Sequence, residues 1–69
     1  MNAPTRLAAL VQRRYGPVNA YALAAIHANE PRCTRLARAM DRGIVLPGEA
    51  VRETVRIAVD TMATWGVTR

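Results

Sequence analysis

Apolar residues recur along this chain at the three- and four-residue spacing of amphipathic helices, and short segments with glycine, proline or asparagine interrupt the pattern. No apolar run approaches the roughly 20 residues that are needed to span a bilayer. The pattern therefore predicts a single small all-α domain of about four helices, over residues 3–15, 20–28, 30–42 and 48–65.

Residues at the ends of these segments fit helix termini. Asn2, Asn19 and Asn29 can each cap the start of a helix, because the asparagine side chain accepts a bond from a free backbone N–H group. Gly16-Pro17 is expected to end the first helix and Gly43 the third, since glycine adopts the left-handed conformation found there and proline cannot continue a helix.

The last predicted helix, 48–65, carries the most regular apolar stripe. The short apolar linker before it, 44–46, is expected to pack its side chains into the core. We expect Trp65 to lie in the core; if it is exposed, Met62, Trp65 and Val67 would offer a dimer interface, because aromatic residues anchor such contacts. The stripe consists of Val51, Val55, Ala58, Met62 and Trp65.

Composition narrows the class of protein. A chain of 69 residues has room for one core, and a domain of this size buries only about 60% of its unfolded surface, so a dimer would supplement its stability. No charged and then apolar leader follows Met1, and a cytoplasmic location is expected. Ten arginines against five acidic residues give a net charge of +5, a field that attracts nucleic acid or an acidic protein.

The residues needed for catalysis or metal binding are scarce. The chain has no serine, one histidine (His27) and one cysteine (Cys33), which is expected to be a small buried side chain. A metal site normally takes three or four ligands, and the only local group is His27, Glu30 and Cys33, which a turn interrupts. We therefore predict no catalytic residue, no metal and no cofactor.

The segment 19–36 has the pattern of a helix-turn-helix motif, in which a positioning helix packs across a recognition helix. With the turn at residues 27–29, all the inward positions are small or apolar, as that packing requires. These positions are Ala22, Ile26, Ala28, Cys33 and Leu36.

Two further segments make the chain resemble the small Cro-like repressor domains of phages and mobile elements. Residues 15–24 look like the aromatic–glycine turn and alanine-rich helix that open the motif, and residues 43–47 look like the glycine–proline segment that follows the recognition helix. The match spans residues 7–66 in spacing and residue class. The chain departs from the family in two ways: His27 or Asn29 stands where the family has a turn glycine, and the third helix is longer than usual. The alternative to a helix-turn-helix fold is another packing of four helices.

The resemblance implies a transcriptional regulator that binds double-stranded operator DNA as a dimer, with the third helix in the major groove. Arg32 and Arg35 would then reach base edges, and Thr34 a base or a phosphate. Phosphate contacts would come from Arg13, Arg14, Arg38 and Arg42, and they would make binding salt-dependent. The DNA-binding set is Asn29, Arg32, Thr34, Arg35, Arg38 and Arg42.

Two other functions suit a small basic chain without catalytic groups. One is a phage-type inhibitor or modulator that docks on a host enzyme such as RNA polymerase or a defence complex. The other is a nonspecific nucleic-acid-binding or antitoxin-like protein. Four of the ten arginines fall between Arg32 and Arg42, on or beside the expected recognition helix, and this concentration favours DNA.

Overall fold

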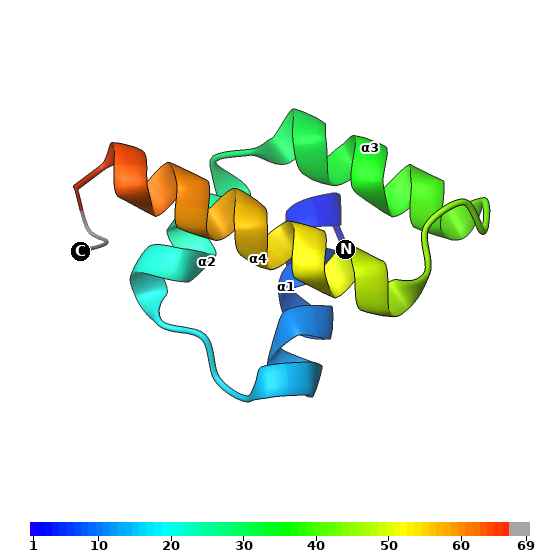
Figure 1. Cartoon of the computed structure of the whole chain (residues 1–69), viewed down its shortest axis with the longest axis horizontal. Helices are drawn as coiled ribbons and strands as arrows, with labels where there is room; N and C mark the ends of the chain where they lie inside the picture. Colours follow the sequence, from blue (N-terminus) through cyan, green and yellow to red (C-terminus); the bar gives the residue numbers. More distant parts are fainter. Residues whose placement is uncertain (67–69) are drawn as a thin grey trace.

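The computed structural model describes residues 1–66, and this part of the chain folds into four α-helices without a strand. The longest helix, α4, crosses the middle of the view; α1 passes behind it, α2 lies beneath one of its ends, and α3 runs across the top (Figure 1). The all-α prediction is confirmed, and every helix begins and ends within one residue of its predicted bounds. The helices are α1 (Ala3–Tyr15), α2 (Ala20–His27), α3 (Glu30–Asp41) and α4 (Pro47–Thr64).

Two of the three predicted caps are present. The Asn2 Oδ1 atom accepts the Thr5 N–H at 2.9 Å, and the Asn19 Oδ1 atom accepts the Ala22 N–H at 2.8 Å. Each bond satisfies a backbone donor that has no partner inside its own helix. The third prediction is wrong, because the side chain of Asn29 makes no capping bond to α3.

The core lies where α4 packs on α2 and α1, and where α1 packs on α3. Leu7, Ile26 and Ile57 provide its large, fully buried side chains. Most of the other buried positions are small, which allows the helix backbones to approach one another closely. The small core residues include Ala8, Ala25, Cys33, Ala37, Ala50 and Ala58.

The linker between α3 and α4 does not fill the core as expected. Ile44 is 70% exposed and Leu46 is 64% exposed, and only Val45 packs against the core. The N–H groups of Ile44 and Val45 both bond to the Ala39 carbonyl, so the chain stays wrapped around the end of α3. Because Pro47 begins α4 immediately afterwards, the linker has no length left to turn inward.

None of the helices in residues 1–66 combines the length and the apolar composition that crossing a membrane requires.

The substitution Ile26→Ala should lower the free energy of unfolding by about 2–5 kcal/mol, since it leaves a cavity in a closely packed interior. Urea denaturation followed by circular dichroism measures this loss. Ile44→Ala removes the same atoms from an exposed position and should change stability by less than about 0.5 kcal/mol. Equal losses in the two variants would contradict the burial pattern described above.

Candidate nucleic-acid interface

Helices α2 and α3 are joined by a turn at Ala28 and Asn29. Ile26 and Cys33 are buried on the two sides of the turn, and the Cys33 thiol lies 3.5 Å from the Ile26 carbonyl oxygen as a weak donor. Asn29 has a φ of −115°, so the turn needs no left-handed residue and no glycine. Ala28 is exposed, so its predicted inward position is wrong; it is the residue that caps the end of α2.

Asn29 holds this turn against α4. Its side-chain amide donates to the Ala25 carbonyl and to the Thr61 Oγ1 atom, both at 2.7 Å. The two N–H bonds of the amide are therefore used within the protein. Sequence reasoning assigned Asn29 to capping and DNA contact, and missed this role, because Thr61 lies 32 residues away along the chain.

The outward face of α3 carries a row of arginines. Arg35, Arg38 and Arg42 are all exposed and lie on the side of the helix opposite the buried Cys33 and Ala37. Seven residues at a rise of about 1.5 Å place Arg35 and Arg42 about 10 Å apart along the axis. None of the three forms an ion pair within residues 1–66.

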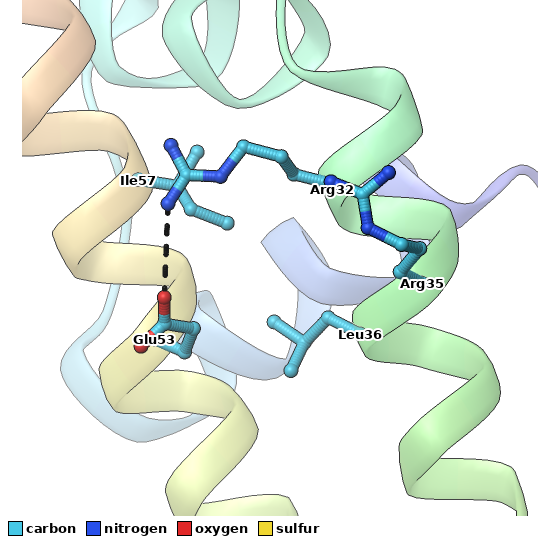
Figure 2. A pocket seen from close by; sticks show the side chains of 5 residues that line it. All are labelled: Arg32, Arg35, Leu36, Glu53 and Ile57. Carbon is cyan, nitrogen blue, oxygen red and sulfur yellow. Dashed lines mark ion pairs between the residues drawn. The ribbon is translucent and has the colours of Figure 1, made fainter.

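Arg32 lies on the flank of α3 and behaves differently from that row. Figure 2 shows its side chain reaching across to α4, over Ile57, while the side chain of Arg35 stays against α3. The Nη2 atom of Arg32 is 3.7 Å from the Oε2 atom of Glu53, across an open groove of about 270 Å³ that Leu36 also lines. Because both side chains are more than 40% exposed, the ion pair adds at most about 1 kcal/mol, and Arg32 can leave it readily.

A second ion pair joins the start of α1 to the end of α3. The guanidinium of Arg6 meets the carboxylate of Asp41 through two hydrogen bonds, of 2.7 and 3.2 Å. The hydrogen bond from Arg6 lowers the pKa of Asp41. The contact pairs the negative charge of Asp41 with a cation on α1, in the last turn of α3 where Arg38 also lies.

The remaining predicted residues lie at three other places. Thr34 is half-buried on α3. Arg13 and Arg14 are exposed at the end of α1, beside the start of α4. Met62 packs against the core, whereas Trp65 is 46% exposed at the end of α4, so its expected place in the core is wrong. Val67 lies outside the described residues.

Residues 1–66 contain no cluster of metal-binding side chains, and their one thiol is buried. No group of three or more His, Cys, Asp or Glu side chains in this part of the chain could hold a metal ion. His27 is exposed, and burial raises the pKa of Cys33, which keeps the thiol protonated.

Comparison with known proteins yields no relative of this chain. It matches no family model, no curated protein and no solved structure. The function therefore has to be inferred from the surface of α3 and its surroundings.

The two bonds of the Asn29 amide can be tested with a double-mutant cycle. Asn29→Ala should lower the free energy of unfolding by about 1–3 kcal/mol, because it leaves Thr61 without its donor. In a Thr61→Val background the same change should cost about 0.5–1.5 kcal/mol less. Thermal unfolding of the four proteins measures the coupling, and additive losses would show that the two side chains do not interact.

Proposed function

We propose that this chain is a small DNA-binding protein that contacts the duplex through the outward face of α3. The observation that carries the proposal is the row formed by Arg35, Arg38 and Arg42, which is exposed and free of ion pairs within residues 1–66. The chain has a net charge of +5, and such a field attracts the phosphate backbone at long range.

The dimensions of α3 suit the major groove. Its 12 residues form a rod about 18 Å long, and the groove is about 12 Å wide, enough to admit one helix. An arginine can donate two bonds to the O6 and N7 atoms of guanine, or one or more to a phosphate oxygen. Arg35 lies near the middle of the rod and is assigned to a base edge. Arg38, in the last turn, and Arg42, which caps the end of the helix, are assigned to phosphates.

Two residues next to the row complete the proposed interface. Arg32 joins it when its guanidinium leaves Glu53, and Thr34 can donate its hydroxyl to a phosphate from the flank of α3. Asn29 is left out of the interface, because both N–H bonds of its amide are used to hold the turn on α4.

The order of a short helix, a turn and a basic helix supports a more specific form of the proposal. In helix-turn-helix regulators the second helix of the pair enters the major groove, and dimers read two half-sites about one DNA turn apart. We propose this arrangement for α2 and α3, in keeping with the resemblance to Cro-like repressors. Trp65, which is 46% exposed, is then available to a dimer contact.

Replacing the arginines of the row should weaken DNA binding in a salt-dependent way. Each phosphate contact contributes a slope of about −0.9 to the plot of log K against log salt, so each of Arg35→Ala, Arg38→Ala and Arg42→Ala should flatten the slope by about one unit or less. A base contact should also cost about 1–3 kcal/mol of affinity. Fluorescence anisotropy with a labelled duplex, titrated at several salt concentrations, measures both.

Arg52→Ala and Arg56→Ala are matched controls, because they remove the same charge from exposed positions on α4. They should leave the salt slope close to that of the unchanged protein. If the unchanged protein binds no duplex near physiological salt, or if the α4 variants lose as much affinity as the α3 variants, the proposed interface is wrong.

Glu53→Gln should tighten DNA binding, because it releases Arg32 and removes a negative charge beside α3. The gain should be about 2- to 5-fold at low salt and should shrink as salt screens the charges. The same anisotropy titration measures it, with Glu49→Gln as a control that removes an acidic residue from the start of α4. A gain that persists in an Arg32→Ala background would show that it does not come from Arg32.

A further inference from the structure

A second groove lies on another part of the surface, between the end of α1 and the start of α4. Its volume is about 240 Å³, and its apolar lining includes Leu10 and Val51, with Pro47 and Gly48 at the start of α4. This is below the roughly 300–1,000 Å³ of pockets that enclose a whole small molecule. The groove therefore has room for a single anchoring side chain.

Exposed apolar residues lie next to this groove along the chain. Ile44 and Leu46, which directly precede Pro47, are 70% and 64% exposed. Exposed apolar residues that gather into one patch are typical of contact surfaces. They have no use in contacts to DNA phosphates, so the proposed function does not account for them.

The charge beside the groove is positive. Arg13 and Arg14 line its α1 side, and neither forms an ion pair within residues 1–66. The carboxylate of Glu49 accepts the Leu46 N–H at 2.9 Å, which ties this acidic group to the start of α4. An occupant that complements the groove thus needs acidic groups toward α1 and an apolar side chain in the hollow.

We infer that this groove is a docking surface for an acidic segment of a partner protein, with one bulky apolar residue flanked by carboxylates. The apolar residue inserts between Leu10 and Val51. The exposed Leu46, which precedes the groove-lining Pro47 in the chain, adds apolar contact at the edge of the groove. The flanking carboxylates pair with Arg13 and Arg14. The surface is separate from the arginine row on α3, so the protein can hold DNA and the partner through different helices.

Synthetic peptides test the surface on the whole 69-residue chain. The first peptide carries a tryptophan between glutamates, the second replaces the tryptophan with serine, and the third replaces the glutamates with glutamine. Titrated into ¹⁵N-labelled protein, the first should shift the amide signals of residues 10–14 and 44–51. Burying one large side chain contributes about 1.5–3 kcal/mol, so the second peptide should bind about 10- to 100-fold more weakly. The third should also bind more weakly, because it lacks the carboxylates.

Variants of the protein separate the two parts of the surface. Leu46→Ser should weaken binding of the first peptide at least about 5-fold through lost apolar contact, and the fold should be retained because serine is a favoured residue at the start of a helix. Arg13→Gln should weaken binding about 2- to 5-fold, as expected for one exposed ion pair. Arg56→Gln removes the same charge from α4 and should leave binding unchanged.

Three results of the peptide titrations would overturn this inference. The serine peptide would bind as tightly as the first peptide, the shifted amide signals would be centred on α3, or no peptide would bind at millimolar concentration. Sedimentation that shows a Leu46-dependent dimer would assign the surface to a second copy of the chain, and Leu46-dependent binding to phosphatidylserine vesicles would assign it to a membrane.

Leu46→Ser should leave DNA affinity unchanged, and Arg38→Ala should leave peptide binding unchanged, so this inference and the proposed function can fail independently.

Discussion

Close packing of α4 on its neighbours through small side chains is the constraint on which the rest of this structure depends. Ala50 and Ala58 on α4 and Ala25 on α2 are buried in one core cluster, and side chains this small allow the helix backbones to approach closely. Tight packing of this kind gains dispersion contacts, but it provides few large apolar side chains for burial. The domain therefore keeps a thin core, and several large apolar residues remain at the surface.

Buried side chains and two polar contacts together position α3, whose Cys33 and Ala37 lie in the core. The amide of Asn29 joins the α2–α3 turn to Thr61 on α4, and the ion pair of Arg6 with Asp41 joins the far end of α3 to α1. The two contacts lie at opposite ends of the helix. They add to the apolar packing of Cys33, Leu36 and Met40, which fixes the face that α3 turns outward.

The surface that results has two regions of different chemistry. On α3, three arginines without ion pairs in residues 1–66 form a row that suits a polyanion. Between α1 and α4, an apolar hollow lies beside Arg13 and Arg14, and the exposed Leu46 adjoins it in sequence. Affinity for a polyanion such as DNA comes mainly from positive side chains that reach the phosphates. Affinity for a protein comes mainly from an apolar centre with polar or charged groups around it. These two sets of features lie on different helices, α3 on the one hand and α1 with α4 on the other.

The sequence by itself determined the local structure. Helix bounds, the caps at Asn2 and Asn19 and the burial of Cys33 follow from spacing and from side-chain chemistry within a few residues, and such signals are complete in a short stretch of chain. It also placed four arginines, from Arg32 to Arg42, on or beside the third helix.

Only the tertiary structure decided which residues meet across the molecule. Asn29 looked like a cap, and its amide instead bonds to a threonine 32 residues away. Ile44 and Leu46 looked like core residues, yet the end of α3 and the start of α4 hold the linker outside. Arg32 belongs with the other arginines of α3 by spacing alone. The packing of α4 on α3 places Glu53 3.7 Å from its guanidinium, which sets it apart from them. Periodicity gives the direction of a side chain from its own helix, and the partner that it finds there depends on how the helices are packed.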